Sequence, residues 1–468
     1  MSIPLISMGM ETAESAPLST KTKVLYGMGA FGYGSVGQTL GSFLMFFGTG
    51  ILGIPGALMG LAIALSTVWD ATTDPFVGYF SDRTKSRRFG KRHGFLLVGC
   101  LGVAAFNLVL WTISPTLPLW TKFSLILGVL LILETFNTTY STPYQALGLD
   151  LSKNYQDRTA VQGYRTTFSF MALLVPSVLM SIFLAPGRYG DIWSSSQGYV
   201  HIALVTSTLC VICGLIAFVG TYKHRPVNIA VQEKSSSRSI FSDFFSVFRQ
   251  KNVSRLIVGY AISLSAGAFI TTLGLHIFTY TFLFSTLEIP FIMLSLILGI
   301  ILGQPIWYFF SRRTDKVNAL LTALGVVLMG MVFFSIILAV RNEINPAFLL
   351  PIVCITIFVC GLGTGCLYSL PMSMFADCVE IEKQRTGVDK TAISAGFLTF
   401  CMKISNAFIM FLIGVTLDLI GFRGNLATQS MSVQNWLGWV LIIGVVTSCT
   451  IAMFVYKGYS YNRKDFED

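Results

Sequence analysis

Charged residues are scarce in this sequence of 468 residues. Only 12% are Asp, Glu, Lys or Arg, while 53% are apolar or aromatic, and a soluble domain usually carries about 25% charged residues. So few charges cannot cover a water-facing surface or keep a chain unfolded. This excludes an ordinary soluble enzyme and an intrinsically disordered protein, and leaves a polytopic helical membrane protein.

The motifs of common enzyme classes are also absent. There is no Gly-x-Ser-x-Gly elbow, no His-Glu-x-x-His zinc motif and no Gly-x-x-x-x-Gly-Lys-Ser/Thr phosphate loop. The nine cysteines lie mostly in apolar runs, and Cys210 and Cys213 have no second pair at metal-binding spacing. We therefore expect buried thiols rather than disulfides or a zinc site, no cofactor and no enzymatic activity. The N-terminus also lacks the basic start and apolar stretch of a cleavable signal peptide.

Long apolar runs take up most of the chain, and each is near the roughly 20 residues that a membrane-spanning helix needs. They are too long and too continuous for the strands of a β-barrel. We predict an all-α protein with twelve transmembrane helices in two six-helix bundles. The expected helices are 24–52, 55–80, 94–114, 119–148, 160–185, 199–221, 254–284, 289–311, 318–340, 347–373, 391–417 and 434–457.

The basic residues between these runs are distributed unevenly. Most of the 32 Lys and Arg residues fall on the side of the N-terminus, while only Lys122, Arg188, Arg341 and Arg423 fall on the other side. Because cytoplasmic loops are rich in Lys and Arg, we expect both termini in the cytoplasm. The net charge of +10 then reflects topology, and we expect no nucleic-acid partner.

The two halves of the sequence echo each other. Residues 79–83, which end the second expected helix, resemble residues 309–313, which end the eighth. Similar segments at the same place in each half favour two parallel repeats, although chance similarity of basic loops is the alternative. The expected division is a tail at 1–23, bundles at 24–221 and 254–457 with a linker at 222–253, and a tail at 458–468.

Five ionisable residues interrupt the apolar helices: Asp70, Asp74, Glu134, Arg165 and Lys403. A charge at the bilayer centre costs at least about 2.5–3.5 kcal/mol on insertion scales, so each needs a reason. Asp70 and Asp74 are four apart and share one helical face. Such carboxylates repel each other unless a proton or a metal ion neutralises them. With the Thr73 hydroxyl they predict a Na⁺, Li⁺ or H⁺ site, and the alternative is a structural ion pair with Arg165 or Lys403.

The other residues of note in the expected helices have more ordinary interpretations. We expect Lys403 to be the counter-charge of the acidic pair, whereas Glu134 either binds substrate or protons or neutralises Arg165. His276 is expected to be a packing residue. The glycines of the first helix, including the Gly37-x-x-x-Gly41 pair, are expected to pack against other helices, and Tyr33 either stacks on a sugar or fills apolar space.

Several segments resemble the major facilitator superfamily, and within it the glycoside–pentoside–hexuronide:cation symporters, which include the melibiose carrier. The resemblance covers roughly 24–457. It is strongest at Trp69-Asp70-Ala71-Thr72-Thr73-Asp74-Pro75 and the Gly78–Arg87 stretch that follows, and extends to Pro143-Tyr144-Gln145, Arg158-Thr159 with Tyr164-Arg165, and Met374-Phe375-Ala376-Asp377.

The resemblance implies roles for individual residues. Asp70, Thr73, Asp74 and Thr138 would surround the coupling cation, Lys403 would link cation to substrate, and Arg165 would face the central cavity. A cytoplasmic gate would contain Arg158, Asp377 and Glu380. The candidates for substrate binding or coupling are Lys403, Arg165, Glu134, Tyr33, Ser141, Tyr144, Gln145, Tyr368 and Thr399.

The same comparison also shows departures. Gly34 and Ser141 stand where the melibiose carrier has acidic residues that grip sugar hydroxyls, so melibiose is not the expected substrate. Leu133-Glu134-Thr135 followed by Pro143-Tyr144 also resembles the sodium-dependent lysophospholipid transporters of animals.

We therefore predict a monomeric, cation-coupled symporter of a sugar, glycoside or uronide in the lipid bilayer of a bacterial inner membrane. The alternatives are a lysolipid or other amphiphile as cargo, and a membrane enzyme or receptor that does not transport. The expected coupling ion is Na⁺ or H⁺, with Li⁺ also allowed.

Overall fold

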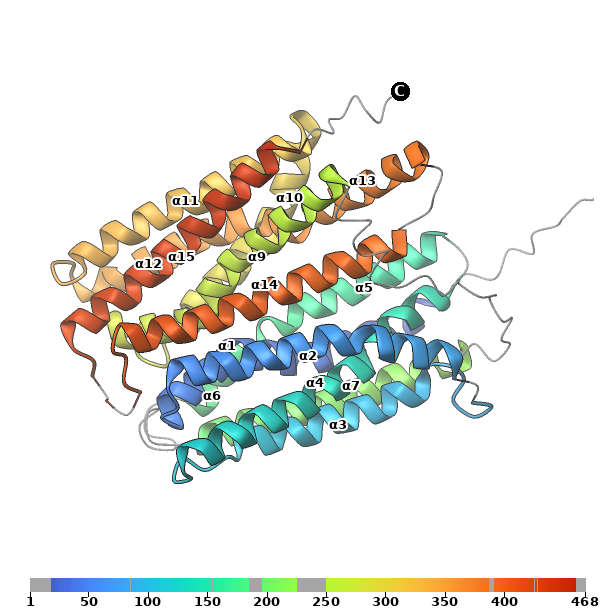
Figure 1. Ribbon diagram of the computed structural model, residues 1–468, viewed down its shortest axis with the longest axis horizontal. Coiled ribbons are helices and arrows are strands. Elements are labelled where there is room, and N and C mark those ends of the chain that lie inside the picture. Colours follow the sequence, from blue (N-terminus) through green and yellow to red (C-terminus); the bar gives the residue numbers. More distant parts are fainter. Residues whose placement is uncertain are drawn as a thin grey trace, which may run out of the picture.

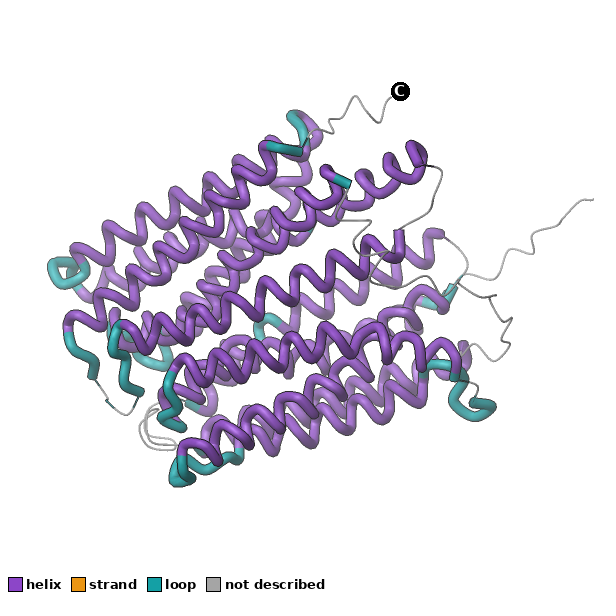
Figure 2. The backbone as a smooth tube through the Cα atoms, in the orientation of Figure 1, coloured by secondary structure: helices purple, strands orange, loops and turns teal. Residues whose placement is uncertain are grey.

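A computed structural model describes residues 18–84, 86–152, 155–184, 196–224, 250–386, 391–424, 426 and 428–459. Within these residues the chain is helical apart from short connections (Figure 2), and no strand is assigned in the described part. The predicted all-α fold is therefore confirmed. The expected tails at 1–23 and 458–468 and the linker at 222–253 lie largely outside the described residues.

The helices form two groups that follow each other in the chain (Figure 1). The first group contains α1 (Thr20–Phe46) with the π-helical turn η1 (Phe47–Ile51), α2 (Gly56–Arg83), α3 (His93–Trp111), α4 (Leu119–Asp150), α5 (Tyr155–Ala172), α6 (Val175–Phe183), α7 (Gln197–Thr221) and η2 (Tyr222–His224). The second contains α9 (Lys251–His276) with η3 (Ile277–Thr281), α10 (Ile289–Arg313), α11 (Lys316–Val340), α12 (Pro346–Gly365) with η4 (Cys366–Tyr368), α13 (Leu370–Thr386), α14 (Thr391–Leu419) and α15 (Met431–Lys457).

Ten helical stretches of the described chain are long and apolar enough to cross a membrane. The helices α1 and α2 are not among them, because α1 is rich in glycine and α2 carries Asp70 and Asp74 among its apolar residues. Both nevertheless lie alongside the other helices of their group (Figure 1). The chain is thus a multi-pass membrane protein, and the polar residues of α1 and α2 are tolerated because neighbouring helices enclose them.

Two of the expected helices are interrupted. The predicted helix at 160–185 ends at Ala172 and restarts at Val175, where Pro176 lies in the first turn of α6. The predicted helix at 347–373 ends as α12 at Gly365, and α13 begins at Leu370 directly before Pro371. A proline cannot donate the helical hydrogen bond and disfavours the helical conformation of the residue before it, which accounts for both breaks.

Several irregularities of the backbone occur at matching places in both groups. The first helix of each ends in a π-helical turn, η1 or η3. Each turn is followed by a residue with positive φ, Gly53 at 65° and Leu283 at 56°. The second helix of each, α2 or α10, contains an internal proline, Pro75 or Pro305. These matched irregularities support two parallel structural repeats.

Glycine packing is found at some of the expected positions and also elsewhere. An added Cβ at Gly27, Gly29 or Gly32 of α1 would lie 2.6 Å from Phe168, 2.7 Å from Tyr140 or 2.8 Å from Cys213, so these glycines pack against other helices as expected. A Cβ at Gly37 or Gly41 would meet nothing within 4 Å, so these residues do not hold helices together and the expectation for this pair is wrong. Backbone contact occurs instead at Gly56 and Gly60 of α2, where a Cβ would lie 2.5 Å from the Gly414 carbonyl oxygen and 2.6 Å from that of Met410 on α14. A Gly-x-x-x-Gly pattern identifies small residues but not the helix face that needs them.

In the described chain, the most extensive contacts between the two groups are those of α2 with α14, α1 with α9, and α6 with α10. We call the side on which α1 begins and α15 ends the terminal side, and the opposite side the distal side. In Figure 1, α2 and α14 run side by side at the boundary between the groups. The residues that position the site lie along this boundary.

Candidate functional site

An acidic pair lies on α2 in contact with a lysine of the other helix group. Lys403 Nζ of α14 is 2.6 Å from Asp70 Oδ2 and 2.5 Å from Asp74 Oδ2. The side chains of Asp70, Asp74 and Lys403 are 14%, 26% and 22% exposed, so solvent screens the three charges only in part. One ammonium thus holds two carboxylates of the opposite half of the protein.

Threonines of α4 supply hydroxyls to the same carboxylates. Thr138 donates a hydrogen bond to Asp70 Oδ1, and Thr142, one turn further on, donates to Asp74 Oδ1 at 3.3 Å. Thr73 Oγ1 lies 3.5 Å from Thr138 Oγ1. Thr142 was not among the residues predicted from the sequence, although its spacing of four from Thr138 matches the spacing of the two aspartates and could have identified it.

This donor set contains only oxygen ligands and one ammonium. No group of three or more His, Cys, Asp or Glu side chains that could hold a metal ion occurs in the described ranges. Two carboxylates and nearby hydroxyls suit a proton or a hard cation that binds oxygen, and do not suit soft metals that prefer sulfur or imidazole. Because Lys403 already contacts both carboxylates, a bound cation would compete with its ammonium for the same oxygens.

Glu134 lies beside this acidic centre. Its Oε2 accepts a hydrogen bond of 3.1 Å from Asn137 Nδ2, and both residues line a small cavity of about 150 Å³. Gly41, Asn406 and Met410 line this cavity and also a larger central one. Gly37 and Gly41, which belong to the glycines expected to pack helices, therefore border empty space here.

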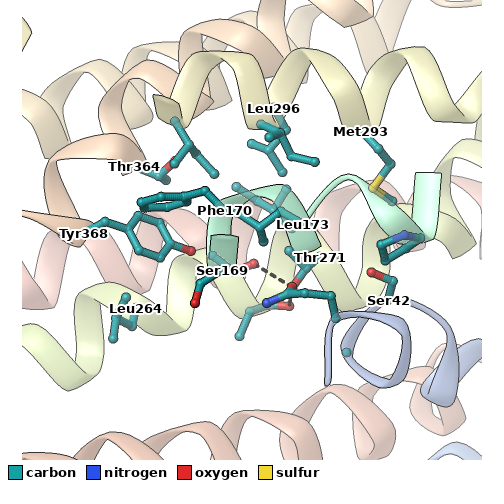
Figure 3. Close-up of a pocket in the computed structure, with 18 of the residues that line it drawn as sticks. Ser42, Ser169, Phe170, Leu173, Leu264, Thr271, Met293, Leu296, Thr364 and Tyr368 are labelled. Atoms are coloured by element: carbon teal, nitrogen blue, oxygen red, sulfur yellow. Dashed lines mark hydrogen bonds between the residues drawn. The ribbon is translucent and has the colours of Figure 1, made fainter. Parts of the chain in front are cut away.

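The central cavity lies between the two helix groups and has a volume of about 690 Å³. Both helix breaks contribute to its wall, since Leu173 and Pro176 line it from the first group and Leu367 and Tyr368 from the second. Figure 3 shows Phe170 and Tyr368 next to each other at one end of the cavity, with Ser42 and Met293 at the other. Interrupted helices at a central cavity are a recurring feature of secondary transporters.

The structure brings some of the predicted substrate residues to this cavity and not others. Tyr33, Arg165 and Tyr368 line it. The Tyr144 side chain is buried between α1 and α4, where its ring stacks on Tyr26 at 4.5 Å and its hydroxyl donates to the Tyr26 carbonyl. The other three predicted residues are not among those that line the cavity: Ser141, Gln145 and Thr399.

The residues predicted to form a gate lie on the terminal side but have separate partners. Asp377 forms an ion pair with Lys316 of α11, and Arg158 Nε donates to the Ser152 carbonyl at 2.8 Å. Glu380 accepts a hydrogen bond from Gln384 at 3.4 Å. Within the described residues no ion pair joins Arg158 to either acid.

A different ion pair fastens the N-terminal end of α1 on this side. Asp157 of α5 accepts a 2.8 Å hydrogen bond from the Leu18 amide and a 2.6 Å bond from Lys23 Nζ. These two donors, the amide first, lower the pKa of the Asp157 carboxyl. Because they stabilise its ionised form, the carboxylate holds the start of α1 against α5 at neutral pH.

The distal side is closed by uncharged contacts between the helix groups and by one helix cap. His276 Nε2 of α9 lies 3.1 Å from Thr49 Oγ1 of η1, and the imidazole packs edge-on against Phe46 and Phe422. Asp418 of α14 accepts hydrogen bonds from the first amides of α2, at 2.6 and 2.8 Å. His276 packs as predicted from the sequence. Asp418 was not predicted, because an acidic residue next to a loop is ordinary.

The chain is similar in sequence to known membrane transporters. A profile of the family described as MFS/sugar transport protein matches residues 25–463. The sodium-dependent lysophosphatidylcholine symporter 1 of Xenopus tropicalis is 22% identical, with 96% of this chain and 88% of the relative aligned. The isoprimeverose transporter of Lactiplantibacillus pentosus is 23% identical, with 97% of this chain and 94% of the relative aligned.

Solved structures share the fold at lower identity. A bacterial homolog of the human lysosomal transporter Spinster superposes with a TM-score of 0.65 at 12% identity, over 96% of this chain and 99% of that one. The nucleoside transporter NupG gives a TM-score of 0.64 at 14% identity, over 94% and 99%. The chain therefore belongs to the MFS/sugar transport protein family of the major facilitator superfamily, and it is a membrane transporter rather than an enzyme.

Proposed function

We propose that the protein is a cation-coupled symporter that carries a glycoside or uronide across the plasma membrane by alternating access. The observation that carries the proposal is the contact of Lys403 with both Asp70 and Asp74. This contact joins α14 of one helix group to α2 of the other. A cation that binds the two carboxylates therefore changes the attraction between the two halves, and this is how ion binding would be coupled to their relative movement.

The proposed coupling ion is Na⁺ or H⁺. Two carboxylates that share one lysine retain one net negative charge, which one monovalent cation neutralises. Thr138 and Thr142 contact the carboxylates directly and offer further oxygen ligands. The small cavity at Glu134 adjoins the central cavity through shared residues, which would let the substrate sense the occupancy of the ion site.

The orientation follows from charge. We place the terminal side in the cytoplasm because the sequence concentrates Lys and Arg in its loops. The distal contacts would then close the extracellular side, and the structure would represent a state in which the cargo exchanges with the cytoplasm. The proposed unit is a monomer with bundles at 24–221 and 254–457.

One observation favours a second candidate cargo. The cavity wall formed by α10 is apolar, with Met293, Leu296, Ile297 and Ile300. An acyl chain fits such a wall by hydrophobic burial. A lysolipid is therefore the alternative cargo, and relatives named as lysophosphatidylcholine symporters support it.

Uptake by proteoliposomes tests the proposal. Radiolabelled glycosides, uronides and lysolipids are offered under an imposed Na⁺ or H⁺ gradient, and accumulation of the unmodified solute above its external concentration is expected. The Asp74→Asn variant should lose gradient-driven accumulation, because it removes one of the two carboxylates. The Glu343→Gln variant, a matched change at an exposed site on the distal side, should retain it. Full ion-driven accumulation by the Asp74→Asn variant would contradict the proposed ion site.

A further inference from the structure

A hollow of about 390 Å³ lies on the surface of α15 near the distal side, away from the central cavity. The described residues that line it all belong to this one helix: Ser432, Asn435, Trp436, Trp439 and Ile443. Trp436, Trp439 and Ile443 are exposed, whereas Leu437 and Leu441 on the other face of α15 are buried. The hollow therefore lies on the face of α15 that is turned away from the protein and toward the lipid.

The lining of this hollow changes from polar to apolar with depth. Because α15 begins at Met431 on the distal side, Ser432 and Asn435 lie nearest the water. Ile443 follows Ser432 by eleven residues, or about 16 Å of helix, which is close to half of a hydrocarbon core of about 30 Å. The two tryptophans lie between these ends, and tryptophan is enriched at membrane–water interfaces. The same order of headgroup, interface and acyl chain is found in one leaflet of a bilayer.

A buried positive charge lies directly behind the polar end of the hollow. Arg341 follows α11 and is only 8% exposed. Its guanidinium donates to the Leu338 carbonyl at 2.8 Å and to Asn435 Oδ1 at 2.6 Å, and lies 3.9 Å from Met431 Sδ. All three partners are neutral, and within the described residues Arg341 forms no ion pair, not even with the exposed Glu343. The protein therefore leaves the charge of Arg341 without a counter-charge.

The contact with Arg341 also orients the Asn435 amide. A guanidinium has only hydrogen-bond donors, so it holds the amide oxygen and leaves the Nδ2 group of Asn435 to donate elsewhere. Ser432, Trp436 and Trp439 add a hydroxyl and two indole N–H groups to the same lining. No acidic side chain is among the described residues of this lining. Donors around an uncompensated cation match the oxygens of an anion such as a phosphate.

We propose that this hollow binds an anionic phospholipid of the distal leaflet. Its phosphate accepts hydrogen bonds at Ser432 and Asn435, and one acyl chain lies along Trp439 and Ile443. The negative charge of the lipid offsets that of Arg341 and fastens the adjoining ends of α11 and α15 at the membrane surface. A zwitterionic lipid matches less well, because its own ammonium group already neutralises its phosphate. The site is separate from the transported solute and from the ion site.

Two lipids with identical acyl chains test this recognition. The full chain is purified in detergent, stripped of lipid and titrated with dioleoyl phosphatidylglycerol or dioleoyl phosphatidylcholine, and bound lipid is counted by native mass spectrometry. The first phosphatidylglycerol should bind about tenfold more tightly than the first phosphatidylcholine, which corresponds to 1.4 kcal/mol. Phosphatidylglycerol should also raise the melting temperature more than phosphatidylcholine does, since only the folded protein contains the site.

One conservative variant assigns the preference to this hollow. Asn435→Asp places a carboxylate beside Arg341, so the protein supplies the counter-charge itself and repels a phosphate. This variant should lose the preference for phosphatidylglycerol, yet melt in phosphatidylcholine at least as high as the unmodified protein. Gln197→Glu is the matched control, because it makes the same amide-to-acid change at the exposed distal end of α7 and should keep the preference. Arg341→Gln should lose it as well; if this variant does not fold, Asn435→Asp decides the question.

The remaining outcomes overturn the proposal. These are equal affinity of the unmodified protein for the two lipids, an undiminished preference in Asn435→Asp, and an equal loss in Gln197→Glu. A dimer in the same spectra that Trp439→Ala dissociates would place a second copy of the chain on this face and would also overturn it. Because no transport is measured, failure of the proposed symport function leaves this result unaffected.

Discussion

Two regions join the helix groups of this transporter, and their chemistry differs. The distal region is formed by the α2–α14 crossing, the Thr49–His276 contact and the Asp418 cap of α2, so its partners are backbone groups and neutral side chains apart from the Asp418 carboxylate, which binds backbone amides. The acidic centre at mid-depth joins the same two helices through the contact of Lys403 with Asp70 and Asp74. The α2–α14 pair therefore contains one contact that depends on close packing and another that depends on charge.

The two regions of α2 and α14 should therefore respond differently to an ion. The strength of a packing contact without an ionisable partner changes little when a monovalent ion binds, whereas the attraction of Lys403 for two carboxylates changes once an ion occupies them. The distal region then determines how tightly that side closes. The acidic centre determines whether closure depends on the ion. Changes in the first region should alter conformational balance at any ion concentration, and changes in the second should alter the ion dependence.

The largest effect is expected where a methyl group is added at the crossing. In the Gly414→Ala variant the new Cβ meets the Gly56 carbonyl oxygen, so the helices must separate at a cost of about 1–3 kcal/mol. Gly128→Ala is the matched control, because nothing lies within 4 Å of its added Cβ and alanine favours a helix by about 0.5–1 kcal/mol. Thermal melting in detergent should therefore move in opposite directions for the two variants. A similar fall in both would contradict the close crossing.

The acidic centre should respond to loss of a single hydroxyl. Thr142→Val removes the hydrogen bond to Asp74, and its length of 3.3 Å places it at the low end, about 1.5 kcal/mol, of what hydrogen bonds to charged groups contribute. Loss of an oxygen ligand should raise the half-saturating Na⁺ concentration about tenfold in uptake assays, whereas for H⁺ the loss of a donor that stabilises the ionised carboxylate should lower the half-saturating proton concentration. Thr139→Val is the control, since the Thr139 hydroxyl donates to the Thr135 carbonyl of its own helix. Equal ion dependence in both variants would remove Thr142 from the site.

The sequence predicted the acidic centre better than it predicted the distal region, for a physical reason. Asp70, Asp74 and Lys403 are charges in apolar helices, where a charge is so costly that it draws attention by itself. Asp418 lies next to a loop, where an acidic residue is ordinary, so its role as a cap for α2 is visible only when both helices are in place. Thr142 is an intermediate case: a threonine in a helix is ordinary, but its spacing from Thr138 matches that of the two aspartates and could have identified it.

Glycine and proline show the limit of local patterns. Gly37 and Gly41 have the spacing of a packing motif but border cavities, while Gly56 and Gly60 have the same spacing and contact α14. Likewise Pro75 and Pro305 lie inside continuous helices, whereas Pro176 lies directly after a break. Neighbouring helices decide these outcomes, so the twelve-helix arrangement was predictable from the sequence but the lining of the cavity was not.

A smaller effect is expected from the cap that crosses between the groups. Asp418→Asn removes a charge from the first amides of α2, and charges at helix ends contribute about 0.3–1 kcal/mol. A cysteine at Ala57 should then react faster with a membrane-impermeant maleimide, because the distal side opens more often. Asp315→Asn is the control, since Asp315 caps α11 within its own group and should lower the melting temperature without changing the labelling rate. Equal acceleration in both variants would show that Asp418 has no special part in closing this side.

The smallest effect should come from the two residues with positive φ that follow η1 and η3 in the distal region. Leu283 has φ of 56°, a conformation that costs a side chain about 1–2 kcal/mol, while the equivalent position in the first group is Gly53. Leu283→Gly relieves that cost but adds the flexibility of glycine to the unfolded chain, so we expect a net gain below about 1 kcal/mol. Gly53→Ala should have the opposite sign. If thermal melting shifts in this way while the ion dependence of uptake stays constant, the distal region contributes stability and shape, and the sensitivity to ions resides in the acidic centre.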